Sequence, residues 1–165
     1  MHPPRLSSFS YQGMHRYYLT LCVFPRRPVF TSATIVNPIL RQFRQSSKAH
    51  DIELTAHCFM HDHVHLLCTA LSESSELRPF VADAKQRSGY SFRKEHGASL
   101  WQKGYYDHVL RDEEDVLSVV LYIVGNPVRA RIASVLGEYP FCGSDRYSMA
   151  EIAACLQMWT PPWRR

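Results

Sequence analysis

The chain has 165 residues, a length typical of one domain with its own core, and no shift in composition along it indicates a second domain. Its 19 Lys and Arg against 15 Asp and Glu give a net charge of +4, which suits a polyanionic partner without requiring one. Five cysteines without a CxxC pair favour reduced thiols in a cytoplasmic protein. Because the sequence shows no secretory leader and no run of about 20 apolar residues, we expect neither export nor a membrane span.

We expect one domain flanked by two short terminal sections. Residues 1–13 are rich in Pro and Ser and predict a loose N-terminal arm. Residues 14–147 hold the patterned segments and form the predicted domain, and residues 148–165 predict a short helix and a tail. The tail holds aromatic and basic residues that suit either contacts with bases and phosphates or an ordinary exposed end: Trp159, Trp163, Arg164 and Arg165.

The first patterned segments predict a strand and then a helix. Residues 16–24 are aromatic and β-branched and indicate a strand that Pro25 ends. Apolar residues recur at helical spacing over residues 33–48, which predicts a helix with one buried side. Pro38 leaves a later helix start open, with Asn37 as the N-cap.

The middle of the chain packs four histidines into nine residues. Residues 52–70 are long enough for two strands, and His61-Asp62 is a suitable turn dipeptide, so we predict a hairpin. Because side chains alternate along a strand, His63 and His65 near the start of its second strand point to one face. Such a pair is suited to binding a divalent metal; the alternative is neutral imidazoles packed in a half-buried site.

Two more helices and a strand are expected in the second half. Residues 75–95 predict a helix that Gly97 ends, residues 101–110 an aromatic strand, and the residues around Tyr122 a further helix. Basic side chains here suit either phosphate contacts or a solvated surface. The candidate DNA-binding residues are Lys85, Arg87, Arg93, Lys94 and Arg129.

The order of these elements is strand, helix, strand, strand, helix, strand and a further helix. It fits an α+β fold, a ferredoxin-like antiparallel sheet (βαββαβ) with helices on one face plus an additional C-terminal helix. On that last helix the apolar residues cluster on one side, while Tyr122 lies on a polar stripe that extends to Asn126. The tyrosine can therefore face outward.

Three ordered blocks, Phe59–Leu67, Tyr106–Glu113 and Tyr122–Arg129, carry a resemblance to a known family. The chain resembles the single-tyrosine HUH transposases and, within them, most of all the REP-associated tyrosine transposases. The resemblance spans roughly residues 15–147 and implies the same ferredoxin-like fold. A single His-hydrophobic-His triplet would be weak evidence, but three blocks in order are much more specific.

The resemblance implies a metal-dependent DNA endonuclease and strand transferase. Tyr122 would attack a DNA phosphate and form a 5′-phosphotyrosine link, while His63 and His65 hold Mg²⁺ or Mn²⁺. The third metal ligand would be Asn126, four residues after the tyrosine. Since Gly125 and Pro127 disfavour continued helix, Asn126 is almost as well suited to a role as a C-cap or turn residue.

The chain departs from the family pattern in two places. His61 stands where Pro is common, and it either offers an extra ligand or only occupies the turn; we favour the turn. Arg131 stands where Gly is common, which bears on the backbone turn after Pro127. Asp107 and His108 match the family block, where they suit either a hydrogen bond that orients a metal ligand or packing at the strand edge.

The expected partner is single-stranded or hairpin DNA associated with repeats. We expect a monomer or a homodimer that works in the cytoplasm, associated with the nucleoid. Whether Tyr122 meets the histidines of its own chain or of a partner is left open. One rival is a non-cleaving nucleic-acid-binding protein with the same fold. Another is a small metallohydrolase that uses His57, His61, His63 and His65 with water as the nucleophile.

Overall fold

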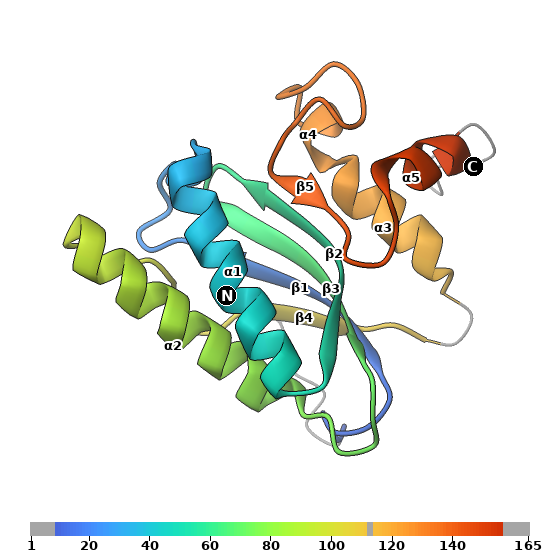
Figure 1. The fold of residues 1–165 in the computed structure, drawn as a ribbon, viewed down its shortest axis with the longest axis horizontal. Helices are drawn as coiled ribbons and strands as arrows, with labels where there is room; N and C mark the ends of the chain where they lie inside the picture. Colours follow the sequence, from blue (N-terminus) through green and yellow to red (C-terminus); the bar gives the residue numbers. More distant parts are fainter. Residues whose placement is uncertain (1–8, 112–113, 157–165) are drawn as a thin grey trace.

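A five-stranded antiparallel sheet with the order β4-β1-β3-β2-β5 forms the centre of the protein. The structure is a computed structural model that describes residues 9–111 and 114–156 (Figure 1). The elements are β1 (Arg16–Cys22), α1 (Ala33–Ala49), β2 (Ile52–Met60), β3 (His63–Ala70), α2 (Leu77–His96), β4 (Tyr106–Val109), α3 (Val116–Val124), α4 (Asn126–Arg129), β5 (Cys142–Gly143) and α5 (Met149–Leu156). The order β4-β1-β3-β2 is that of a ferredoxin-like sheet, so the predicted fold class is confirmed.

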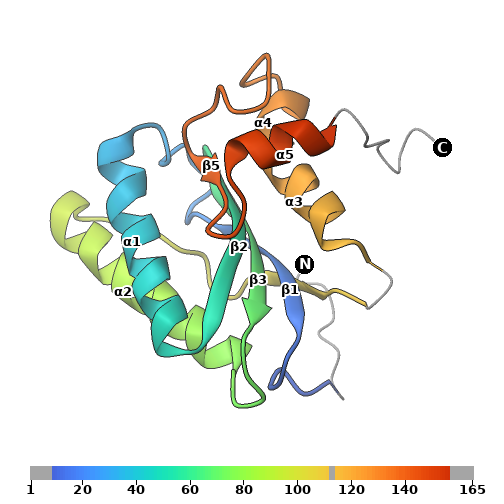
Figure 2. The same cartoon turned by 45° about the vertical axis from the view of Figure 1, so that its right-hand side comes forward.

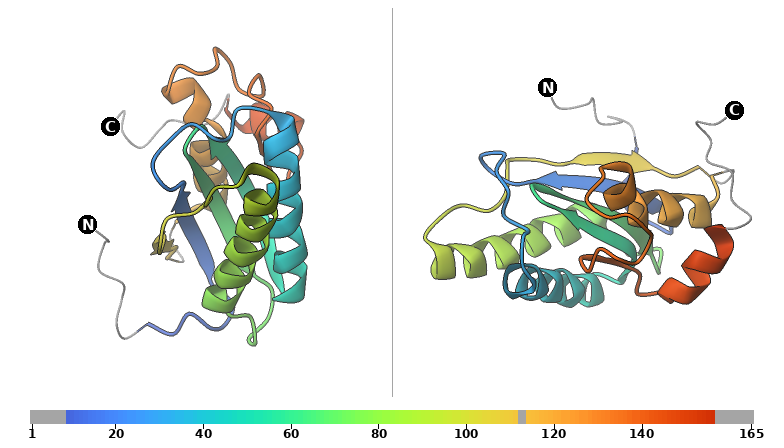
Figure 3. Two further views of the ribbon diagram at one scale, coloured as in Figure 1. Left: turned by 90° about the vertical axis from the view of Figure 1, so that its left-hand side faces the viewer. Right: turned by 90° about the horizontal axis from the view of Figure 1, so that it is seen from above.

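The two faces of the sheet pack against different helices (Figure 2). Helices α1 and α2 lie side by side on one face (Figure 3), where Phe43 and Phe80 join the buried Leu66 of β3 in one core. On the other face, Val120 and Ile123 of α3 form a second core against the sheet. Because strand residues alternate between faces, the same sheet supports both cores.

The predicted hairpin is confirmed. Strands β2 and β3 are joined at His61 and Asp62, and β3 begins with His63. Strand β3 also pairs with β1, which sets Thr20 directly opposite His65. Because β3 is paired with β1 on one side and with β2 on the other, the backbone of both candidate metal ligands is held in place.

The helix predicted over residues 33–48 is confirmed as α1, whereas the strand predicted over residues 101–110 is shorter than expected. Helix α1 runs through Pro38 from Ala33, because Val36, before the proline, is already buried in the core and tertiary packing outweighs the lost backbone bond. The strand expected over residues 101–110 is reduced to β4. Gly104, with φ of +80°, turns the chain before β4. Trp101 forms only an isolated β-bridge, with the residue that follows β1.

The ends of the described chain are packed onto the domain. Tyr11 is buried and its hydroxyl donates to Asp107 at 2.7 Å, so residues 9–13 of the expected loose arm are held in place. Ile152 of α5 is buried in the core on the α3 side of the sheet. Residues 1–8, and the tail with its candidate DNA-contacting residues from Trp159 to Arg165, lie outside the described residues.

The cysteines only partly follow the expectation of reduced thiols. Cys58 of β2 and Cys142 of β5 are opposite each other in the sheet and are joined by a disulfide, whereas Cys22, Cys68 and Cys155 are free. Sequence spacing did not reveal this pair because 84 residues separate the two cysteines. Within residues 9–111 and 114–156, no helix combines the length and apolarity needed to cross a membrane.

Arg131 adopts a left-handed backbone conformation, with φ of +58°. Replacing Arg131 with Gly should raise the free energy of unfolding by roughly 1 kcal/mol, because only glycine adopts this conformation without steric cost. The melting temperature should rise by about 2–4 °C in a thermal unfolding experiment. Arg131→Ala is the control: it removes the guanidinium but keeps the Cβ, and an equal gain with Ala would show that backbone strain is not the cause.

Candidate active site

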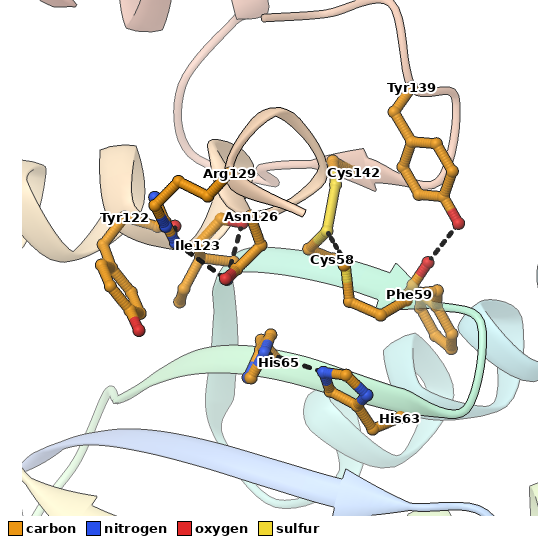
Figure 4. Close-up of a disulfide and its surroundings, with 11 residues drawn as sticks. Cys58, Phe59, His63, His65, Tyr122, Ile123, Asn126, Arg129, Tyr139 and Cys142 are labelled. Carbon is orange, nitrogen blue, oxygen red and sulfur yellow. Dashed lines mark hydrogen bonds between the residues drawn. A yellow bond between two sulfur atoms is a disulfide. The ribbon is translucent and has the colours of Figure 1, made fainter. Parts of the chain in front are cut away.

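Two histidines of β3 meet on the sheet face that carries α3. The Nε2 atoms of His63 and His65 are 3.1 Å apart (Figure 4). Their neighbours Val64 and Leu66 point to the α1 and α2 face and are fully buried there. The alternation of strand side chains therefore directs both imidazoles toward α3.

The outer ring nitrogen of His63 is held by a carboxylate. Its Nδ1 lies 2.6 Å from Oδ1 of Asp62, whose other oxygen accepts from Arg26 at 2.7 Å. Because an ionised carboxylate can only accept, Nδ1 of a neutral His63 carries the proton and Nε2 carries the lone pair. Partial burial opposes ionisation of Asp62, but the hydrogen bonds from His63 and Arg26, together with the positive charge of Arg26, outweigh it and lower the pKa of the carboxyl.

His65 is held by two hydroxyl groups of β1. Its Nδ1 is 2.8 Å from the Tyr18 hydroxyl and 3.0 Å from Oγ1 of Thr20. Hydroxyls both donate and accept, so these partners can serve His65 with the proton on either nitrogen. Burial, together with repulsion from His63 and Arg129, lowers the pKa of His65 to about 3, which keeps the ring neutral at physiological pH.

Helix α3 places Tyr122 over the same face. Asp115 caps the helix by accepting from the backbone N–H groups of Leu117 and Ser118, and the apolar side of the helix is buried against the sheet. Tyr122 is 38% exposed, and its ring meets Tyr18 edge-on with 6.2 Å between centroids. The Tyr18 ring in turn stacks on His65 with 5.6 Å between centroids, so the ring of Tyr18 links Tyr122 to His65 of the same chain.

Asn126 and Arg129 of α4 close the upper side of the site (Figure 4). The Asn126 amide donates to the carbonyl of Ile123 at 3.2 Å, and its Oδ1 accepts from Arg129 at 2.7 Å. The Arg129 guanidinium also covers the Tyr122 ring, 4.1 Å from its centroid, and donates to the Tyr122 carbonyl. The side chain of Asn126 therefore makes a contact at the end of α3, which fits the alternative role as a cap or turn residue. Arg129 contacts both Asn126 and Tyr122 and holds them in place.

The histidine pair fits a divalent cation. Two nitrogens that bind one ion at about 2.1 Å and roughly at right angles are about 3 Å apart, close to the separation of these Nε2 atoms. Among the described residues, no group of three or more His, Cys, Asp or Glu side chains could hold a metal. A third protein ligand from these residues would therefore be a side chain other than His, Cys, Asp or Glu. The amide oxygen of Asn126 is a suitable ligand for Mg²⁺ and Mn²⁺.

The other two histidines of the four do not join this site. His57 of β2 pairs with Leu66 and is buried on the α1 and α2 side of the sheet, where its ring lies beside Phe59 and burial lowers its pKa to about 4. His61 is exposed in the turn, and its carbonyl accepts from the backbone N–H groups of Val29 and Phe30. The four-histidine hydrolase is therefore not supported by the geometry, and His61 serves the turn.

Asp107 and His108 also have other partners. Asp107 accepts from Tyr11, and Nε2 of His108 lies 3.0 Å from Glu114. Neither contacts His63 or His65 in these interactions, so packing at the strand edge describes them better than the orientation of a ligand.

The candidate basic residues of α2 lie across the sheet from the histidines. Lys85 donates to the carbonyls of Gln102 and Gly104, and Arg87 pairs with Asp83 at 2.7 Å. Arg93 and Lys94 occupy the last turn of the helix. Any DNA contact they make would therefore be remote from the histidine pair, whereas Arg129 lies at it.

Sequence reasoning missed the groups that hold the two imidazoles. Asp62 was interpreted only as a turn residue, although its position next to a histidine at a strand start suits a hydrogen bond to that ring. Tyr18 and Thr20 could not be found without the register of β1 against β3, which the sequence does not reveal. Once Thr20 is known to oppose His65, both contacts follow.

The chain is similar to proteins that move DNA. Residues 12–126, more than half of the chain and including His63, His65 and Tyr122, match the family described as IS200-like transposases. The chain belongs to this family. Its members are tyrosine transposases, enzymes that act on DNA, and the resemblance to REP-associated tyrosine transposases is confirmed.

Individual relatives agree with this membership in the IS200-like transposases. A Haemophilus influenzae protein named as a REP-associated tyrosine transposase is 23% identical over 147 residues, covering 82% of this chain and 83% of its own. The structure of a REP-associated tyrosine transposase bound to a REP hairpin superposes with a TM-score of 0.71 at 20% identity, covering 86% of this chain and 82% of that chain. A Deinococcus radiodurans R1 protein named as a transposase gives a TM-score of 0.52 at 20% identity, covering 80% and 92%.

Proposed function

We propose that this IS200-like transposase is a metal-dependent endonuclease and strand transferase that cuts single-stranded or hairpin DNA through a 5′-phosphotyrosine intermediate. The observation that carries the proposal is the meeting of Tyr122, through Tyr18, with the His63 and His65 pair within one chain. A nucleophile beside a two-histidine metal site is the minimum needed for phosphoryl transfer to a tyrosine. The enzyme would work in the cytoplasm on nucleoid DNA.

Tyr122 would attack the scissile phosphorus with its hydroxyl oxygen. The bond from phosphorus to the 3′ oxygen breaks, the phenol proton passes to solvent, and the departing strand takes up a proton as a free 3′-hydroxyl. A later 3′-hydroxyl can attack the phosphotyrosine and release Tyr122, so strands are rejoined without ATP. A bound Mg²⁺ or Mn²⁺ held by His63 and His65 supplies charge that stabilises the phosphate oxygens and the leaving oxygen.

Asn126 is the proposed third ligand, and Arg129 would have to release it. The Asn126 Oδ1 that suits a cation accepts a hydrogen bond from Arg129, and a bound cation would repel the guanidinium from that oxygen. Arg129 would then be available to a DNA phosphate next to Tyr122. The two roles assigned to this corner, helix-end contact and ligand, therefore belong to two states of the same residues.

Hairpin DNA is the proposed substrate class. A solved relative is described as bound to a REP hairpin, and this chain shares its fold. A face that carries exposed aromatic and basic groups around the histidine pair suits an unpaired strand next to a stem. Because Tyr18 links Tyr122 to His65 of the same chain, we propose that each site is built from a single chain, in a monomer or in a homodimer.

A cleavage assay with differently labelled hairpins tests the proposal. Full-length protein with Mn²⁺ should form an adduct stable to boiling in detergent when a cleaved oligonucleotide carries its label at the 3′ end. The same oligonucleotide labelled at the 5′ end should yield only a shorter free strand, because the protein joins the 5′ phosphate of the downstream piece. Binding with no adduct at any Mn²⁺ concentration would instead identify the non-cleaving nucleic-acid-binding protein.

Asp62→Asn should weaken Mn²⁺ binding by about 10-fold, since loss of a carboxylate that orients a ligand histidine typically costs about 10- to 100-fold in metal affinity. Titration calorimetry with Mn²⁺ measures the effect without DNA. Asp107→Asn is the matched control, because Asp107 hydrogen-bonds Tyr11 instead of a histidine of the pair, and its Mn²⁺ affinity should match that of the parent. Equal losses in the two variants would remove Asp62 from the site.

A further inference from the structure

An exposed aromatic side chain lies on the same sheet face as the histidines, two strands away. Tyr106 of the edge strand β4 is 41% exposed and pairs across the sheet with Thr20, which itself pairs with His65. Residues opposite each other in an antiparallel sheet point to the same face, so His65, Thr20 and Tyr106 form one row across three strands. Two strand spacings, about 10 Å, separate the ends of this row.

Tyr106 and Tyr122, the proposed nucleophile, both contact the ring of Tyr18. The ring of Tyr18 is approached edge-on by Tyr122 at 6.2 Å and by Tyr106 at 6.5 Å, while Tyr18 stacks on His65. Tyr18 is thus largely enclosed by its neighbours, and burial raises its pKa to about 12. Tyr106, in contrast, keeps much of its ring in solvent at the sheet edge.

We propose that Tyr106 is the stacking platform for an unpaired nucleobase next to the scissile phosphate. The inference rests on the proposed function, since it uses the phosphate position that Tyr122 and the histidine pair define. A DNA strand with one phosphate at the histidine pair would run over the sheet face within reach of β4. A neighbouring base would there meet the exposed ring of Tyr106. Aromatic rings bind bases of any identity by stacking, so this subsite would hold the strand without reading its sequence.

Charge along β4 limits where the phosphates run. His108, the next residue of β4 on this face, is paired with Glu114. Partial burial opposes ionisation of Glu114, but hydrogen bonds from the Arg111 backbone N–H and from His108 outweigh it and lower the pKa of the carboxyl. A carboxylate at this end repels a phosphate, whereas Arg129 beside Tyr122 attracts one. The backbone of the strand would therefore stay on the Arg129 side, with the base turned toward Tyr106.

The platform is tested by measuring DNA binding in full-length Tyr122→Phe protein, because this background should not cleave the DNA during the measurement. Adding Tyr106→Ala should weaken binding of a hairpin with an unpaired extension by about 10-fold, the loss typical of one stacked base. Tyr106→Phe and Tyr106→Trp keep a ring and should bind within about twofold of the parent. Tyr90→Ala is the matched control, because Tyr90 is 72% exposed on α2, across the sheet, and should change nothing.

Abasic substitutions identify the base that stacks. With the base removed at one position next to the scissile phosphate, Tyr106→Ala and the parent should bind equally, while abasic sites further away should leave the 10-fold difference intact. A difference that persists on every abasic substrate, or a Tyr106→Phe protein as weak as Tyr106→Ala, would overturn the platform. The adduct assay with otherwise unaltered protein is independent of this result, so failure of cleavage and failure of stacking are distinguished.

Discussion

Tyr122→Phe should abolish the covalent adduct and strand cleavage, a loss of at least about 10⁴-fold in rate, as expected when a nucleophile is removed. The change deletes only the hydroxyl oxygen that forms the bond to phosphorus. The ring, its edge contact with Tyr18 and the guanidinium of Arg129 above it are all retained. Hairpin binding should therefore remain within about twofold of the parent in a fluorescence anisotropy titration.

The matched control is Tyr90→Phe, which removes an equivalent hydroxyl from the exposed surface of α2 and should leave adduct formation unchanged. If Tyr122→Phe still forms an adduct, peptide mapping of the linked residue would identify a different nucleophile. Tyr18, whose hydroxyl already contacts His65, would be the first residue to check.

His65→Ala should remove measurable Mn²⁺ binding and, with it, cleavage. Loss of a ligand costs more than the roughly 10- to 100-fold expected for residues that only orient one. The substitution also leaves the hydroxyls of Tyr18 and Thr20 without the ring nitrogen they contact, so circular dichroism must establish that the variant is folded. Calorimetric titration with Mn²⁺ in the absence of DNA is the primary measurement, and the adduct assay is the second.

His61→Ala controls for the loss of an imidazole from the same hairpin. Its side chain is exposed, and its contribution to the fold is a backbone carbonyl that alanine retains. The variant should bind Mn²⁺ like the parent. A folded His65→Ala protein with unchanged Mn²⁺ affinity would contradict the metal site proposed at the histidine pair.

The parts of this fold that followed from sequence are those set by local rules. Alternation along β3 was enough to place His63 and His65 on one face, and the turn residues His61 and Asp62 were enough to predict the hairpin. Helical periodicity correctly separated the buried side of α3 from the side that carries Tyr122. These inferences depend on neighbours within a few residues, where steric and hydrogen-bonding preferences are strong.

The parts that did not follow depend on which distant segments meet. The contacts of Tyr18 and Thr20 with His65 arise from a pairing between strands more than 40 residues apart in sequence. Likewise, the cross-strand position of Cys58 and Cys142 could not be anticipated from their spacing. Roles assigned to Tyr122, His63, His65 and Asn126 stay predictions until the variants are measured.

The division of the hydrophobic interior into two cores bears on how this site tolerates change. The proposed metal ligands are built into the sheet, whereas Tyr122 is carried by α3, which packs in a core that it shares with the sheet and with α5. Substitutions at Ile152, which is buried in this core, should therefore disturb the position of Tyr122 more than that of the imidazole pair. Under the proposed mechanism, variants that lose this C-terminal packing should still bind a divalent cation but should lose DNA cleavage.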